Sequence, residues 1–211
     1  EIIYIDNESS DASVDIAHFY QVEKIKTIKK FLPGRAINLG VEASSGEYIV
    51  ILSAHCIPTD KNWLSQLVRS VKPDKIAGVY GRQLPLSSTS PDDARDLLIT
   101  FGYEDRIQLK DPFFHNANSI VKRSAWEKVR FDDSITNIED RDWAKKVLKL
   151  GFHIKYDSEA CVFHYHGLHQ HNNYESFRKY GKDIFNMDDL YLLSEILESL
   201  SGECKILISN F

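Results

Sequence analysis

An acidic pair followed by two closely spaced histidines forms the clearest candidate for chemical function in this sequence. Glu139 and Asp140 open a segment whose apolar residues recur at helical spacing and which ends at Gly151. Further along, His164 and His166 alternate with aromatic residues, which predicts that both imidazoles lie on one face of a strand. A carboxylate at a helix start can act as a general base, and imidazoles can bind a metal ion. The alternative is that the acids only complement the helix dipole and the histidines lie on the surface.

Polar residues also follow other predicted strands. Asp6 ends the first strand, Arg35 lies near a helix start, and His55 follows a buried strand. Ligands of an open parallel sheet bind beyond the carboxyl ends of its strands, so Asp6 could bind a base or ribose and Arg35 a diphosphate. The alternative for residues 6–11 is an Asx turn followed by a helix cap.

The elements that must position these residues alternate between strands and helices. This pattern predicts an α/β fold with a doubly wound, mostly parallel sheet and helices on both faces. The predicted strands span residues 2–6, 24–28, 48–53 and 76–80, and the predicted helices span residues 12–20, 35–44 and 63–71.

The second half of the chain predicts a less regular arrangement. A serine-rich loop at residues 85–91 is interpreted as an insertion over the site. It is followed by a helix at 92–101, a strand near 115–121 and a helix from Ser124. A hairpin-like pair is expected at residues 152–156 and 160–166, with helices to the end. We therefore expect a domain at residues 1–187 and a C-terminal helical tail at 188–211, in which five apolar residues recur at helical spacing: Leu190, Leu193, Ile196, Leu197 and Leu200.

Composition narrows the class of protein. With 211 residues, 43% of them hydrophobic, the chain can build one domain with a sizeable core. A net charge of −5 argues against a nucleic-acid partner. The three cysteines, Cys56, Cys161 and Cys204, are too scattered for a disulfide framework, which favours a reducing compartment. We expect a protein of the cytoplasm, a location that includes the inner face of the membrane. The chain starts directly with a core-like strand, so we expect further residues upstream of Glu1.

In their order and spacing, several motifs resemble those of family 2 glycosyltransferases with the GT-A fold. The resemblance extends from Glu1 to about Gly181. It rests on residues 5–11, 34–40 and 44–52, on Ile138-Glu139-Asp140 and on His164-Tyr165-His166. Each motif is weak alone, and their succession carries the resemblance.

The resemblance implies inverting transfer of a sugar from a nucleotide-sugar donor to a hydroxyl of a glycan or lipid-linked glycan. It makes Asp140 the catalytic base, next to Glu139. The residues implied in donor binding are Asp6, Asn7, Arg35, Asn38 and Ser53. The residues assigned to the sugar and acceptor side are Arg82, Asn116 and Asn118. Peripheral membrane association and a homo-oligomer are compatible with this function.

The chain departs from the family pattern where a metal ion would bind. Ser53-Ala54-His55 stands in place of the usual Asp-x-Asp pair. The family pattern also begins with an earlier strand and helix, which we expect upstream of Glu1. In one interpretation His55, with His166 or His164, binds a divalent cation, with Mn²⁺ favoured over Mg²⁺. His166 is the preferred partner. In the other interpretation no metal binds, and Arg35, helix starts and Arg82 neutralise the diphosphate.

Rival functions remain at this point. A GT-A-like module that lost its metal motif could bind nucleotide or glycan without catalysis. A metal-dependent hydrolase would have to use the histidines at positions 164, 166, 169 and 171, and it would need a third ligand and an open coordination position. A nicotinamide dehydrogenase is excluded because no GxGxxG follows the first strand.

Overall fold

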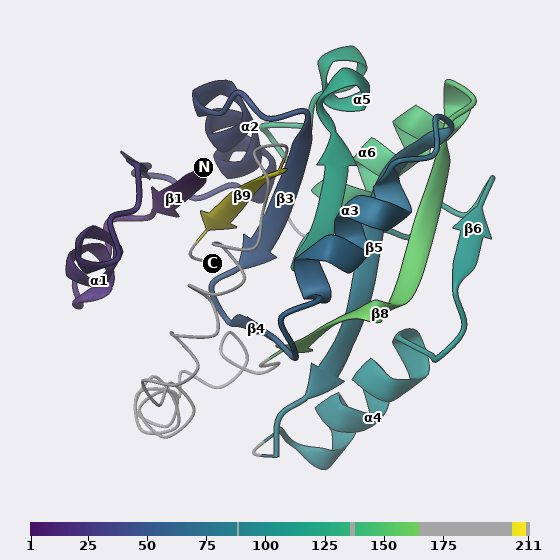
Figure 1. The fold of residues 1–211 in the computed structure, drawn as a ribbon, viewed down its shortest axis with the longest axis horizontal. Helices are drawn as coiled ribbons and strands as arrows, with labels where there is room; N and C mark the ends of the chain where they lie inside the picture. Colours follow the sequence, from purple (N-terminus) through teal and green to yellow (C-terminus); the bar gives the residue numbers. More distant parts are fainter. Residues whose placement is uncertain (88, 136–137, 165–203, 210–211) are drawn as a thin grey trace.

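The computed structural model describes residues 1–87, 89–135 and 138–164, together with the backbone of residues 204–209. Within these residues the strands form a nine-stranded sheet in the order β2-β1-β9-β3-β7-β5-β8-β4, and β6 pairs with β8 (Figure 1). The strands are β1 (Ile2–Asp6), β2 (Lys24–Thr27), β3 (Tyr48–Ser53), β4 (Cys56–Pro58), β5 (Ile76–Pro85), β6 (Arg106–Gln108), β7 (Asn118–Lys122), β8 (His153–His164) and β9 (Cys204–Ser209).

Helices cover both faces of this sheet, as expected. They are α1 (Ser13–Phe19), α2 (Pro33–Ala43), α3 (Trp63–Val71), α4 (Pro91–Thr100), α5 (Arg123–Lys128) and α6 (Glu139–Lys149). In Figure 1, α3 crosses in front of the sheet and α6 lies behind it. The side chains of β3 alternate accordingly: Ile49 and Ile51 join the core under α2, α5 and α6, whereas Val50 and Leu52 join the core under α3.

Strand direction explains why polar residues gather at one edge. β1 runs parallel to β2 and β9, and β3 runs parallel to β9. β7 is antiparallel to both β3 and β5, with Leu52 opposite Asn118. The start of β7 therefore lies beside the carboxyl end of β3, the edge at which ligands of such sheets bind.

The C-terminal segment corrects one expectation. Residues 204–209 form a strand rather than part of a helical tail, and the predicted helix at residues 188–203 lies outside the described residues. β9 is hydrogen-bonded between β1 and β3, with Ile206 opposite both Ile2 and Val50. A short apolar run does not reveal by periodicity whether it is strand or helix. Here the position between two strands satisfies its backbone groups on both sides.

A second correction concerns the hairpin expected at residues 152–166, because β8 is one strand through His164. Its pairing with β5 joins Gly81 to Asp157 and Gln83 to Val162, so β8 bulges between these pairs. The Asp157 carboxylate accepts the amides of Glu159 and Ala160 inside the bulge, at 2.9 and 3.2 Å. The Asp157 carboxylate thus organises a bulge here instead of a reversing turn.

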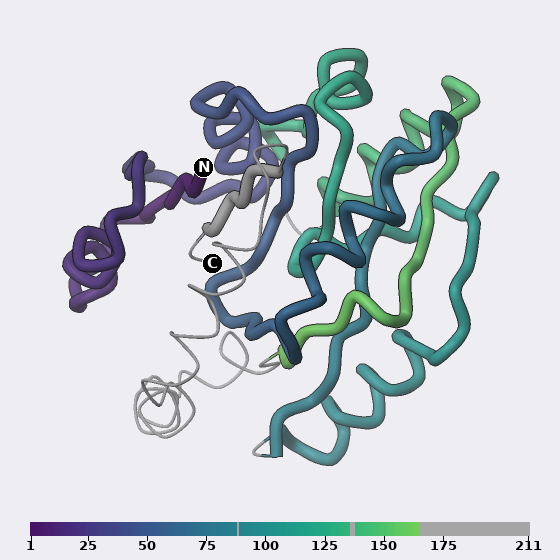
Figure 2. Tube along the Cα trace, viewed as in Figure 1, coloured from purple at the N-terminus to yellow at the C-terminus, as the bar shows by residue number. Residues whose placement is uncertain are grey.

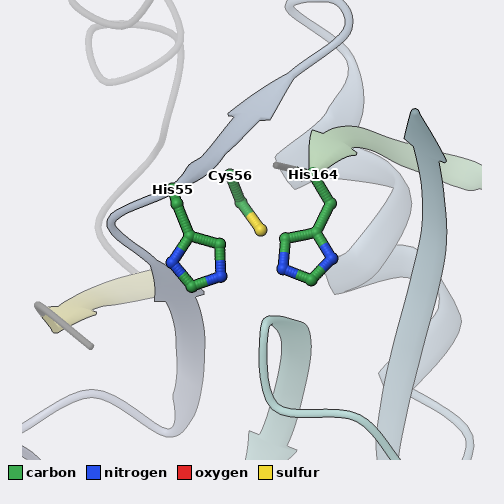
Figure 3. A group of neighbouring side chains, drawn as sticks. All are labelled: His55, Cys56 and His164. Atoms are coloured by element: carbon green, nitrogen blue, oxygen red, sulfur yellow. The ribbon is translucent and has the colours of Figure 1, made fainter. Parts of the chain in front are cut away.

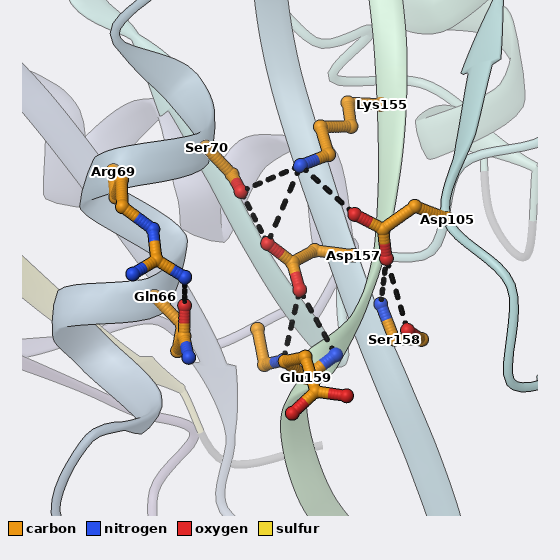
Figure 4. Close-up of polar contacts among 9 residues, drawn as sticks. Gln66, Arg69, Ser70, Asp105, Lys155, Asp157, Ser158 and Glu159 are labelled. Atoms are coloured by element: carbon orange, nitrogen blue, oxygen red, sulfur yellow. Dashed lines mark hydrogen bonds and ion pairs between the residues drawn. The ribbon is translucent and has the colours of Figure 1, made fainter.

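A polar network fastens this bulge to the neighbouring elements (Figure 4). Lys155 Nζ lies 3.1 Å from Asp105 and 3.7 Å from Asp157, and it donates to Ser70 Oγ on α3 at 2.9 Å. Ser70 in turn donates to Asp157. The network holds α3 and the segment before β6 against the middle of β8. No helix among the described residues is both long and apolar enough to cross a bilayer.

Candidate active site

The acidic pair lies at the first turn of α6, as predicted. Glu139 is buried, with 5% of its surface exposed, and Asp140 is half-buried. Asn116 Nδ2 donates to Glu139 Oε1 at 3.3 Å, while the buried Glu139 Oε2 has no hydrogen-bond partner among the described residues. Asp140 Oδ1 accepts the Arg141 amide at 2.7 Å. One carboxylate is therefore fixed inside the protein, and the other remains partly accessible.

Both carboxyl groups are shifted toward the protonated form. Burial raises the pKa of Asp140 to about 7, and repulsion from Glu139 adds to the effect. The backbone amides of Arg141 and Asn116 and the charge of Arg141 oppose this rise in pKa. Burial also raises the pKa of Glu139. A carboxylate whose pKa lies near neutrality suits a general base.

A second group of side chains lies where β3, β4 and β8 meet. A turn at residues 54–55 connects β3 to β4, which lies beside the end of β8 (Figure 2). The ring of His55 stacks on that of His164, with centroids 4.7 Å apart and planes 19° apart. Cys56 lies opposite His164 in the β4–β8 pairing. The potential ligand atoms of His55, Cys56 and His164 all lie within 4.8 Å of one another (Figure 3).

This group fits a divalent cation through nitrogen and sulfur atoms. The structure brings His164 to His55, whereas the preferred partner His166 lies outside the described residues. Sequence reasoning missed Cys56, although it directly follows His55. Its cross-strand position opposite His164 depends on a pairing between residues more than a hundred positions apart, which periodicity does not reveal.

His115 lies between the acidic pair and the histidine cluster, which consists of His55, Cys56 and His164. Its ring lies 6.0 Å from that of His164, and its Nδ1 is 3.1 Å from Gln83 Nε2. The next residue, Asn116, contacts Glu139. A continuous chain of contacts therefore runs from the histidine cluster to the acidic pair. Sequence reasoning did not assign His115 to the site, although it precedes the predicted Asn116.

The predicted donor-binding residues are distributed around the carboxyl edge. Asp6 is buried at the end of β1, and both of its carboxylate oxygens accept the Ser9 amide, at 3.3 and 3.2 Å. This local turn agrees with the alternative interpretation of residues 6–11, in which Asp6 forms a turn before a helix. Asn7 is exposed, and Arg35 is exposed in the first turn of α2. Ser53 Oγ lies 3.1 Å from His55 Nδ1, so it orients that imidazole.

Asn38 is used inside the protein. Its Nδ2 donates to Phe131 O at 2.8 Å and to Asp133 Oδ1 at 2.6 Å, and its Oδ1 accepts Trp126 Nε1 at 2.8 Å. These bonds tie α2 to α5 and to the segment after it. We therefore omit Asn38 from the donor site.

Asn118, predicted on the sugar side, has a similar structural role. Its Nδ2 donates to Arg82 O and Ala160 O, and its Oδ1 accepts Trp63 Nε1. The Arg82 guanidinium stacks over the ring of Tyr103 at 3.7 Å. Asn118 thus fixes the frame behind the site, and Asn116 is the residue of this motif that contacts the acidic pair.

Comparison with known proteins identifies the family. Residues 1–130 match the family described as Glycosyl transferase family 2. The chain belongs to this family of glycosyltransferases.

Two curated relatives have similar sequences over most of the chain. The O-antigen chain rhamnosyltransferase RfbN of Salmonella typhimurium is 26% identical over 193 residues, which cover 85% of this chain and 60% of that protein. WbaN of Salmonella anatum, with the same description, is 26% identical with the same coverage. This chain therefore matches less than two thirds of the length of either relative.

Solved structures confirm the GT-A fold. A mannosyltransferase from Pyrobaculum calidifontis superposes with a TM-score of 0.58 at 15% identity, covering 84% of this chain and 50% of that one. S. aureus TarS superposes with a TM-score of 0.61 at 12% identity, covering 78% of this chain and 51% of that one. GalNAc-T7 superposes with a TM-score of 0.60 at 15% identity, covering 79% and 38%.

Proposed function

We propose that this protein transfers a sugar, with inversion, from a nucleotide-sugar donor to a hydroxyl of a glycan or lipid-linked glycan. The observation that carries the proposal is the chain of contacts between Asp140 and the group formed by His55, Cys56 and His164. Burial raises the pKa of Asp140 to about 7. This chain of contacts links a base to a group that would hold a cation, and the cation would neutralise the charge of the leaving diphosphate. A scattered arrangement of the same residues would have favoured a binding module.

Asp140 acts as the base in this reaction. Its carboxylate accepts the proton of the acceptor hydroxyl while the hydroxyl oxygen forms a bond to the anomeric carbon. The bond from that carbon to the diphosphate oxygen breaks on the opposite face, and its electrons stay with the diphosphate. Glu139 raises the pKa of Asp140, and Asn116 holds Glu139 in place.

The other residues bind and orient the donor. Asp6 and Asn7 contact the nucleoside, and Arg35 contacts the diphosphate. His55 and His164 would hold a divalent cation, which would neutralise charge that develops on the leaving group. The P. calidifontis structure is described in complex with GDP-Man and Mn²⁺, and the GalNAc-T7 structure with UDP, GalNAc and Mn²⁺. These complexes support a nucleotide-sugar donor and a divalent cation, for which we favour Mn²⁺ over Mg²⁺.

The relatives suggest a biological setting. Two proteins with similar sequence are named O-antigen chain rhamnosyltransferases. We infer a role in the synthesis of a cell-surface polysaccharide, on the cytoplasmic side of a membrane, with a glycan or lipid-linked acceptor.

A donor screen tests this function. Nucleotide sugars are added to the purified protein with and without Mn²⁺, and both the melting temperature and the release of nucleoside diphosphate are measured. A true donor raises the melting temperature by mass action and, with an acceptor, releases nucleotide. A non-catalytic module would show a higher melting temperature with the donor but would release no nucleoside diphosphate with any acceptor. That result would overturn the proposal.

A further inference from the structure

We propose that Cys56 supplies a thiolate ligand to the cation bound by His55 and His164, so that this site selects a thiophilic cation such as Zn²⁺ or Co²⁺ over Mn²⁺ and Mg²⁺. The inference rests on the cation site of the proposed function and refines its chemistry. Metal binding exchanges the thiol proton for the cation: the S–H bond breaks, a sulfur–metal bond forms, and the proton passes to water.

Strand pairing places the sulfur next to one imidazole. Cys56 and His164 are directly opposite residues of the antiparallel β4–β8 pair. Side chains of such pairs leave the same face of the sheet with Cβ atoms about 4.5 to 5.5 Å apart. Both residues are buried, with 6% of Cys56 and 3% of His164 exposed. The two ligands therefore come from rigid neighbouring strands.

The turn before β4 supplies the third side chain. Residues of a regular strand alternate between faces, but residues 54–55 form a turn, so His55 can share a side with Cys56. Figure 3 shows the Cys56 sulfur projecting between the two imidazole rings. A tetrahedral zinc site with bonds of about 2.0 to 2.3 Å has ligand atoms roughly 3.3 to 3.8 Å apart. The ligand atoms here lie within 4.8 Å, so small side-chain rotations suffice.

The ligand set favours a borderline or soft cation. Mg²⁺ prefers oxygen ligands, whereas thiolate and imidazole together suit Zn²⁺ and Co²⁺. Three protein ligands also leave one tetrahedral position open, as in catalytic zinc sites. A diphosphate oxygen of the donor can occupy that position.

The position of Cys56 distinguishes it from the other described cysteine. A buried free cysteine often serves only as a small apolar side chain. Cys161 fits that role: it is 9% exposed on β8 and is not part of the cluster. Cys161→Ala is therefore a matched control for Cys56→Ala.

Cobalt spectroscopy tests the sulfur ligand directly. Co²⁺ is titrated into the wild-type protein without donor, and the near-ultraviolet absorption for thiolate-to-cobalt charge transfer is recorded. The band is expected in wild type, Cys161→Ala and Cys204→Ala, and it is expected to vanish in Cys56→Ala and Cys56→Ser. Cys56→Ser preserves the size of the side chain. Melting curves recorded without metal show that each variant is folded.

Competition binding tests the selectivity. Loss of an outer-shell partner commonly weakens metal binding by about 10- to 100-fold, so loss of a direct ligand should weaken Zn²⁺ binding at least about tenfold in Cys56→Ser. Mn²⁺ binding should change less. A cobalt complex of the wild-type protein without the band, or a band that persists in both Cys56 variants, would overturn the inference.

These results separate the inference from the proposed function. If the band is absent but wild type still releases nucleotide from a donor, the sulfur ligand is wrong and the transferase stands. If the band is present and Cys56-dependent while no donor is used, the metal site stands and the transferase is wrong.

Discussion

Asp140 combines partial burial, a like-charged neighbour and a helix start. The same surroundings that make it a suitable base make its charged form costly. Its pKa in the folded state lies above that of an unfolded aspartate, about 3.9, so the pH dependence of folding has a defined sign. Ionisation of Asp140 lowers stability as the pH rises from about 4 to 7, and this loss is complete above the folded pKa.

Replacement of Asp140, the proposed base, should separate catalysis from stability. Asp140→Asn removes the proton acceptor with little change of shape, so turnover should fall by about 100-fold or more while donor binding persists. The melting temperature above pH 7 should equal or exceed that of wild type, because the variant has no buried charge to form. Turnover and melting curves are measured together. Turnover within about threefold of wild type would show that another group is the base.

The pH profile should identify the same group. Because the deprotonated form is the base, the rate should rise with pH and level off above about 7, the raised pKa of Asp140. Glu139→Gln removes the charge that helps to raise this pKa, so the rising limb should move to lower pH. Initial rates from pH 5 to 9 at saturating donor provide the test. If the rising limb lies at the same pH in Glu139→Gln as in wild type, a group other than Asp140 controls the pH dependence of the rate.

At the scale of elements, the β5–β8 contact positions His164, at the end of β8, beside His55 and Cys56. A Cβ added to Gly81 would lie 2.0 Å from the backbone oxygen of Ala160 and 2.4 Å from Asn118 Nδ2. The bulge of β8 depends on this close approach.

Gly81→Ala should therefore destabilise the fold by about 1 to 3 kcal/mol, the range of overpacking effects. The matched control is Gly102→Ala, because a Cβ there meets nothing within 4 Å. Urea unfolding of both variants measures the difference. Equal stability of the two variants would mean that β5 and β8 separate easily at this point.

β9 leads to a second prediction about elements. Leu207 pairs with Ile3 on one side and Ile51 on the other. Leu207→Pro removes a backbone donor in a central strand, whereas Leu207→Ala retains it. We expect the proline variant to be less stable than the alanine variant by about 1 to 3 kcal/mol, because it leaves a buried carbonyl without its donor, as measured by urea unfolding. Variants of equal stability would remove β9 from the sheet.

Local patterns predict much of this fold and less of its site. The apolar spacing of Trp143, Ala144 and Val147 predicts α6, and the continuous apolar run of β3 predicts a strand buried on both faces. The position of β9 depends on pairing between distant parts of the chain, which no local pattern contains. For the same reason Cys56 escaped notice. Asn38 was assigned to the donor from its motif, but the packing of α2 against α5 determines its bonds.

At the scale of the whole molecule, the antiparallel β7 unites the two halves of the site. The start of β7 lies beside the end of β3, and His115 and Asn116 lie in the segment just before β7. These residues contact the histidine cluster on one side and the acidic pair on the other. The family relation, the fold and this convergence support one account, a single displacement in which Asp140 accepts a proton.

The anomeric configuration of the product tests that account most directly. A donor found by the screen is incubated with protein and acceptor, and the new glycosidic bond is examined by nuclear magnetic resonance at the anomeric proton. Single displacement predicts that the configuration is opposite to that of the donor sugar, and that product forms at least about 100-fold more slowly with Asp140→Asn. A product that retains the donor configuration would contradict it.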